Sequence, residues 1–180
     1  MARRLFLTVL IFVMAFYFSC SEKGEKESQS TSGALTNVRM WVPFDEGMKM
    51  LSREKKPVVI DFYTSWCKWC KVMDEKTFSD PQVRNYLARN FITIRLNAED
   101  TKKVFKYQGQ KMNSVQLTRH FGVRGYPSLA YLDSDGQLIT VVPGYVPKST
   151  FLPLLKYIKE GCYKKQISFQ EFLERKQNCD

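Results

Sequence analysis

Apolar residues along the chain gather into short runs that are typical of β-strands. These runs are rich in β-branched and aromatic residues, and the first is apolar at nearly every position, as in a strand buried on both faces. The Asp-Ser-Asp-Gly stretch at 133–136 predicts a turn that joins the last two strands as a hairpin. The predicted strands cover residues 58–63, 91–96, 129–132 and 138–142.

Between the strands, apolar residues recur at the three- and four-residue spacing of amphipathic helices. Asp80 before Pro81, Ser149, and the Ser-Phe-Gln-Glu capping box at 168–171 are signals for helix starts, and Gly122 is a signal for a helix end. The predicted helices lie near residues 44–51, directly after 67–70, from 81 onward, and at 114–121, 149–158 and 169–177.

Residues 100–113 are polar, and they predict a surface excursion without regular structure. The other elements alternate between strand and helix, which indicates βαβ units followed by a terminal hairpin and helix. The sequence therefore predicts an α/β fold, with a central mixed sheet flanked by helices and an extra helix at the C-terminus.

The first twenty residues have the pattern of an export signal. Two arginines precede an apolar run at 5–18, which is too short to span a bilayer comfortably as a mature helix. The run ends at Ser19-Cys20, which resembles a bacterial lipoprotein signal, in which the cysteine becomes the acylated first residue. Tyr17 departs from that pattern, which usually has an aliphatic residue there. Simple secretion and an uncleaved anchor are the alternatives.

The leader sets the expected organisation of the chain. We expect a signal peptide at 1–19, a lipidated Cys20 with a flexible Ser-, Lys- and Glu-rich tether at 20–37, a folded domain at 38–160 and a helical extension at 161–180. The domain would then be held at the bacterial membrane and face the periplasm, where disulfides form.

The net charge of the chain bears on which classes of partner it is expected to bind. The formal net charge is +10, and removing the leader with its two arginines leaves a net charge of +8 on a chain of ordinary globular composition. The lysines are scattered and no nucleic-acid motif is present, so nucleic acid is not an expected partner. A solvated basic surface, acidic partners and anionic lipid headgroups fit the excess of positive charge.

The five cysteines point to thiol chemistry. If Cys20 carries lipid, an even number remains: Cys67 and Cys70 form a Cys-x-x-Cys motif, and Cys162 and Cys179 lie in the extension. The motif also suits a zinc site or a structural disulfide, although Cys162 and Cys179 are not spaced like the close pairs of zinc ribbons. We expect no metal and no cofactor, and we predict a disulfide between Cys162 and Cys179 that clamps the terminal helix.

Several separate segments, in order over residues 40–160, resemble thioredoxin. Asp61 stands where thioredoxins keep a buried carboxylate, and Trp66 where they keep a tryptophan before the first cysteine. Pro127 matches their cis-proline, and Gly144 matches a glycine after their last strand. The resemblance implies a thioredoxin-like fold and a Cys-x-x-Cys redox centre.

Within this family, Trp-Cys-Lys-Trp-Cys-Lys followed by Thr-Phe-Ser-Asp-Pro-Gln-Val resembles exported thioredoxin-like proteins and the thioredoxin domain of membrane disulfide reductases. The dipeptide Lys68-Trp69 replaces the Gly-Pro of thioredoxin. The redox direction therefore does not follow from the motif.

The chemistry of a thiol nucleophile fits this placement. At a helix N-terminus, unpaired backbone N–H groups and the nearby Lys68 would favour the thiolate of Cys67, which we expect to be exposed. Cys70, one turn deeper, would resolve the mixed disulfide after giving its proton to a buried Asp61. We expect the substrate chain to contact Trp66, Trp69, Tyr126 and Pro127.

The sequence thus predicts a membrane-tethered thiol–disulfide oxidoreductase. Its substrates would be cysteine-containing exported polypeptides, and it would act more as a reductase or isomerase than as an oxidase. A membrane disulfide reductase would supply the electrons. The alternative is a thioredoxin-like adaptor or holdase that binds through its tryptophans and does not turn over.

Overall fold

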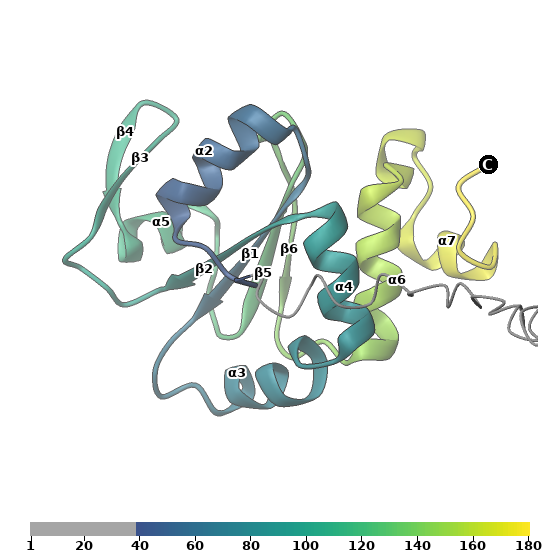
Figure 1. The fold of residues 1–180 in the computed structure, drawn as a ribbon, viewed down its shortest axis with the longest axis horizontal. Coiled ribbons are helices and arrows are strands. Elements are labelled where there is room, and N and C mark those ends of the chain that lie inside the picture. Colours follow the sequence, from purple (N-terminus) through teal and green to yellow (C-terminus); the bar gives the residue numbers. More distant parts are fainter. Residues whose placement is uncertain (1–38) are drawn as a thin grey trace, which may run out of the picture. The chain divides into compact units, whose positions relative to one another are not determined.

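The structure, a computed structural model, describes residues 39–180 (Figure 1). The export signal, Cys20 and the tether lie outside the described residues. Within the described part of the chain, no helix has both the length and the apolar character needed to cross a membrane.

A four-stranded mixed sheet forms the centre of the domain, and its strands agree closely with the predicted ones. Its order is β2 (Ile92–Asn97), β1 (Val58–Tyr63), β5 (Ser128–Leu132) and β6 (Leu138–Pro143). Strand β1 runs parallel to β2 and antiparallel to β5, and β6 pairs antiparallel with β5. All residues of β1 except the last are buried, as its continuous apolar run predicts.

Helices cover both faces of the sheet (Figure 1). On one face, α2 (Phe44–Glu54) and α5 (Ser114–His120) bury apolar side chains against alternate residues of β1. On the other face, α4 (Pro81–Asn90) and α6 (Lys148–Lys159) do the same. The sheet therefore separates two apolar cores, and this is the predicted α/β architecture.

The start of α4 is as predicted, but the start of α6 is not. The Asp80 side chain accepts hydrogen bonds from the backbone N–H groups of Gln82 (2.9 Å) and Val83 (3.2 Å), which is an N-cap. Ser149 was the expected cap of α6, and this prediction is wrong. Pro147 occupies the N-cap position, and its carbonyl accepts from the backbone N–H of Thr150, so the cap lies two residues before Ser149.

The expectation of an irregular segment at 100–113 is also wrong, because this stretch contains a hairpin. Strands β3 (Val104–Tyr107) and β4 (Gln110–Asn113) pair antiparallel across a tight turn whose Gln108 and Gly109 both have positive φ. One face of the hairpin is buried against the core beneath α2. Only Phe105, Tyr107 and Met112 of the two four-residue strands are buried in the core, so the period-two pattern is very short in the sequence.

The C-terminal extension forms a 3-10 turn (Cys162–Lys165) and α7 (Phe169–Glu174), which pack around a small apolar cluster of their own. Ser168 caps α7 by accepting from the backbone N–H of Glu171 at 3.1 Å. The helix was predicted to reach residue 177, but it ends earlier because Lys176 and Gln177 adopt positive φ.

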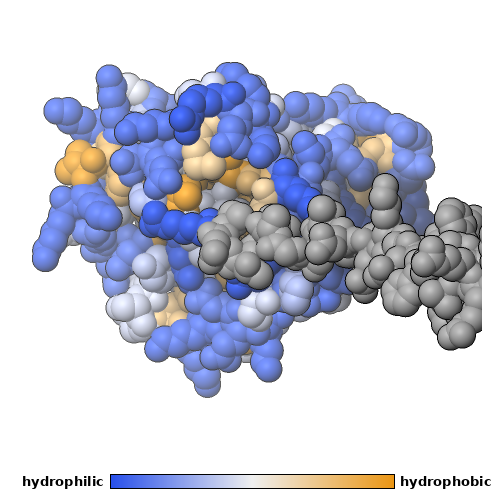
Figure 2. All heavy atoms as spheres, viewed as in Figure 1, coloured by the Kyte–Doolittle hydropathy of each residue, from blue (hydrophilic) through white to orange (hydrophobic). Residues whose placement is uncertain are grey.

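One edge of the four-stranded sheet is covered and the other is open. Val42 lies beside β2, where its N–H donates to the carbonyl of Thr93 (2.9 Å) and its carbonyl accepts from the backbone N–H of Arg95 (3.1 Å). On the outer side of β6, no other strand of residues 39–180 is paired. On the face shown in Figure 2 hydrophilic side chains predominate, and apolar ones gather in small patches.

Candidate active site

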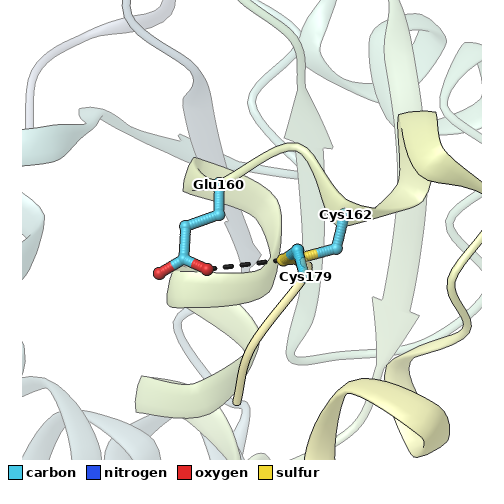
Figure 3. Close-up of side chains that lie close together, drawn as sticks. All are labelled: Glu160, Cys162 and Cys179. Atoms are coloured by element: carbon cyan, nitrogen blue, oxygen red, sulfur yellow. Dashed lines mark hydrogen bonds between the residues drawn. A yellow bond between two sulfur atoms is a disulfide. The ribbon is translucent and has the colours of Figure 1, made fainter. Parts of the chain in front are cut away.

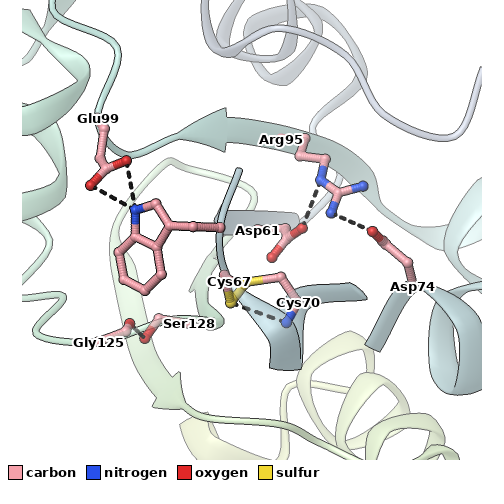
Figure 4. The surroundings of a disulfide bond; sticks show 9 residues. Asp61, Cys67, Cys70, Asp74, Arg95, Glu99, Gly125 and Ser128 are labelled. Carbon is pink, nitrogen blue, oxygen red and sulfur yellow. Dashed lines mark hydrogen bonds and ion pairs between the residues drawn. A yellow bond between two sulfur atoms is a disulfide. The ribbon is translucent and has the colours of Figure 1, made fainter. Parts of the chain in front are cut away.

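The cysteine pair lies where β1 gives way to α3 (Lys68–Met73). Cys67 occupies the N-cap position of α3, and its sulfur accepts a hydrogen bond from the backbone N–H of Cys70 at 3.1 Å. The two cysteines form a disulfide with their Cα atoms 5.3 Å apart (Figure 4). The sulfur of Cys67 therefore meets the free N–H groups of the helix start, the arrangement that stabilises a thiolate.

In this oxidised form the two cysteines are equally covered. Cys67 is 4% exposed and Cys70 is 3% exposed, so the expectation that Cys67 is exposed is wrong for the disulfide state. The cause is local, because the Cys67 sulfur turns toward the first turn of α3, where it bonds to Cys70. The asymmetry between the two residues lies in their places on the helix, at its cap and in its first turn.

Asp61 lies beside the cysteine pair, as predicted, and is 1% exposed (Figure 4). Burial raises its pKa from 3.8 to about 7, Arg95 opposes that rise, and Asp74 adds to it. A carboxyl group with a pKa near neutral can both accept and return a proton at physiological pH, which suits a general acid–base.

Arg95 and Asp74 are functional candidates that the sequence analysis missed. Arg95 on β2 stands opposite Asp61 in the strand register, and its Nε lies 3.0 Å from the Asp61 carboxylate. The same guanidinium lies 2.9 Å from the carboxylate of Asp74 and over the ring of Tyr63, 4.5 Å from its centroid. The one signal available in the sequence was that Arg95 is the only charged residue in the run that forms β2.

The two tryptophans of the motif stand on the surface. Trp66 is 66% exposed and Trp69 is 56% exposed. The Trp66 indole N–H donates to both carboxylate oxygens of Glu99, at 3.1 and 3.0 Å, and its ring meets that of Tyr126 edge-on. The Trp69 ring lies 5.7 Å from that of Tyr145. These contacts hold an apolar surface beside the disulfide, and Glu99 is a third residue that the sequence analysis missed.

The peptide bond between Tyr126 and Pro127 is cis, in the loop that enters β5. The carbonyl of Pro127 accepts from the N–H of Gly144 (2.8 Å), and the Ser128 hydroxyl donates to the carbonyl of Gly125 (2.7 Å). The first bond joins the cis-proline loop to the end of β6, and the second lies within the loop.

Cys162 and Cys179 lie apart from this site, beyond the C-terminal end of α6. The structure joins them as a disulfide with Cα atoms 5.4 Å apart, and a carboxylate oxygen of Glu160 lies 3.4 Å from the sulfur of Cys179 (Figure 3). These three residues are also the one group in the described chain with metal-ligand spacing. Bonded sulfurs offer no thiolate, so the group does not suit a metal in this state.

A model of the thioredoxin-like domain matches residues 44–159. The chain belongs to the thioredoxin-like family. The sequence-based identification of the family and the fold is confirmed, and the Cys67–Cys70 pair supports the predicted enzyme class, a thiol–disulfide oxidoreductase.

Curated relatives of this thioredoxin-like chain include the thiol:disulfide interchange protein DsbD. That of Escherichia coli O6:K15:H31 is 31% identical over 114 residues, which is 63% of this chain and 18% of the relative. That of Salmonella typhi is 34% identical over 110 residues, 59% of this chain and 18% of the relative. The chain thus spans about a fifth of the length of these relatives.

Solved structures support the fold. A thioredoxin-fold protein from Helicobacter pylori superposes with a TM-score of 0.58 at 21% identity, covering 68% of this chain and 80% of the other. The DsbH oxidoreductase superposes with a TM-score of 0.55 at 19% identity, covering 76% of this chain and 94% of the other. At these identities the likeness concerns the fold.

Proposed function

We propose that this protein is an exported, membrane-tethered oxidoreductase that reduces or isomerises disulfides in exported polypeptides. The observation that carries the proposal is the buried Asp61 beside the Cys67–Cys70 pair, with its pKa raised to about 7. Such a group serves the proton transfers that reduction of a disulfide requires.

The reduced protein would act in two exchanges. The Cys67 thiolate attacks one sulfur of the substrate disulfide, a mixed disulfide forms, and the other substrate sulfur leaves as a thiolate. Cys70 then gives its proton to Asp61 and attacks the sulfur of Cys67, which releases the second substrate thiolate and forms the Cys67–Cys70 disulfide. Two electrons pass from the protein to the substrate.

Charges around the pair bear on the redox direction. Negative charge on Asp61 and Asp74 disfavours a thiolate nearby, and a less stable reduced form makes the couple more reducing. Lys68 and the helix start act in the opposite sense. Arg95 offsets part of the negative charge, because it contacts both carboxylates.

The reduction potential of the Cys67–Cys70 couple tests the direction. Equilibration in glutathione buffers should give a value near that of thioredoxin, roughly −270 mV, whereas an oxidant would lie near −120 mV. A value at the oxidising end would contradict the proposed reductase or isomerase activity.

A reductase outside the cytosol needs a source of electrons. We propose a membrane-embedded disulfide reductase as the donor and lipid on Cys20 as the anchor that keeps the domain beside it. Support comes from the likeness to DsbD, a thiol:disulfide interchange protein, and from the lipoprotein-like leader. Trapping Cys70→Ser protein in cells should give a mixed disulfide with such a membrane protein.

A binding function without turnover is the second candidate, favoured by the exposure of Trp66 and Trp69. Insulin reduction in the presence of dithiothreitol separates the two candidates. An oxidoreductase accelerates precipitation of the insulin B chain, and an adaptor or holdase leaves it unchanged or delays it.

A further inference from the structure

An apolar groove follows the outer strand of the sheet. Its volume is about 550 Å³, within the range of ligand-binding pockets. Strand β6 and helix α6 form two of its walls, residues 145–147 between them line one end, and Tyr163 and Phe169 of the C-terminal extension also contribute. None of the twelve described residues that line it is charged, although the whole chain carries a formal net charge of +10. The groove therefore suits an uncharged, apolar occupant.

The groove begins beside the cysteine pair. Tyr145 lines the groove, and its ring lies 5.7 Å from that of Trp69, which stands between the two cysteines in sequence. Gly144, the preceding residue, donates its N–H to the carbonyl of Pro127. The groove is thus continuous with the candidate active site, and an extended chain that presents a sulfur to Cys67 can pass over Trp69 into it.

Strand β6 also offers main-chain groups to an extended occupant. It pairs only with β5 among the described strands, and its sequence, Leu-Ile-Thr-Val-Val-Pro, contains no charged residue. Proteins that must avoid strand addition place charges on such edges, and proteins that recognise extended peptides leave the edge available. Both the backbone and the side chains of this wall therefore fit an extended polypeptide.

We propose that this groove is a substrate subsite. It binds an extended, uncharged segment with at least one large apolar side chain, next to the cysteine that Cys67 attacks. The inference rests on the proposed function, since it places a polypeptide disulfide at Cys67. Residues 161–180 then have a role in recognition, because they extend the groove beyond the thioredoxin-like domain.

Synthetic disulfides test the subsite. The first substrate is a short peptide disulfide limited to the cysteine and its blocked ends. Two longer substrates each add five uncharged residues that include Leu and Phe, one before the cysteine and the other after it. We expect the reduced protein to react at least about tenfold faster with one of the longer peptides, the factor expected from burying one large apolar side chain. Replacing Leu and Phe by Asp should remove this advantage.

Neighbouring residues of α6 provide a matched pair of variants. Thr150 is exposed and lines the groove, whereas Ser149 is also exposed and does not line it. Thr150→Lys should reduce the advantage of the longer peptide to less than about threefold, because binding of the apolar segment would then remove water from the charged lysine. Ser149→Lys should keep the full advantage.

Hydrogen exchange adds a test that needs no groove variant. A Cys70→Ser protein joined to the longer peptide should show slower amide exchange at 138–142 than the same protein joined to the short one. If the short disulfide reacts but the longer peptide gains nothing, or exchange at β6 is unchanged, the groove is not a subsite and the proposed function stands. If the short disulfide does not react, the proposed function itself fails.

Discussion

Replacing Asp61 by asparagine should stabilise the oxidised protein at neutral and alkaline pH. The native carboxyl group has a pKa of about 7, against 3.8 for an ordinary aspartate, so the folded protein holds this proton more tightly than the unfolded chain. Between pH 4 and 7 the folded state binds more protons, and the free energy of unfolding must fall as the pH rises through this window.

The size of the effect follows from the difference between the two pKa values. That difference is about three pH units, and each unit corresponds to about 1.4 kcal/mol, so ionising Asp61 costs the folded state about 4 kcal/mol. Below pH 4 the carboxyl group is neutral in both states and the cost is absent. Asparagine is nearly isosteric and never ionises. The attraction between Arg95 and the ionised Asp61 is already contained in the pKa of about 7, and in the variant Arg95 keeps its contact with Asp74.

Urea unfolding of the oxidised native protein and of Asp61→Asn at pH 4 and pH 8 measures the free energy of unfolding of each protein. The difference in unfolding free energy between variant and native protein should grow by about 4 kcal/mol from pH 4 to pH 8. Asp61→Leu, which removes the same titration with a different side chain, should show the same pH dependence. If native protein and both variants share one pH dependence, burial does not raise the pKa of Asp61 and its role as proton acceptor loses its basis.

Three further predictions concern the cysteines. Cys67→Ser should abolish exchange, whereas Cys70→Ser should accumulate mixed disulfides, visible on non-reducing gels; two variants with equal residual turnover would contradict the assigned roles. Peptide mapping of exported protein should find Cys162 joined to Cys179, and Cys162→Ala should lower the unfolding free energy by about 3 kcal/mol, the model value for a loop near this length. Metabolic labelling with palmitate should mark the native chain and not Cys20→Ala, whereas equal labelling would rule out lipid on Cys20.

Local sequence was sufficient for the central strands and for the cysteine motif. The run of β1 begins with three β-branched residues and is apolar at every position except Asp61, so it predicts a strand clearly, and the Asp80-Pro81 pair specifies a helix start by its own hydrogen bonds. The hairpin of β3 and β4 was not predicted because the alternation of the buried Phe105 and Tyr107 with the exposed Val104 and Lys106 spans only four residues.

The partners of the site residues could not be predicted locally. Arg95 meets Asp61 only because β1 and β2 are in one parallel register, and Glu99 meets Trp66 across 33 residues of sequence. Asp74 reaches Arg95 from the turn that follows α3. Such pairings are properties of the assembled sheet, so a sequence read segment by segment shows charged residues without showing what they contact.

The unequal edges of the four-stranded sheet limit how many chains can join it. Strand addition needs an unpaired edge, and among residues 39–180 Val42 lies along β2, whereas β6 pairs with β5 alone. A sheet with two free edges can grow without end, as fibres do, but two copies that each have a single free edge use up both edges when they pair. We therefore expect a second copy that pairs along β6 to yield a closed dimer in place of a filament.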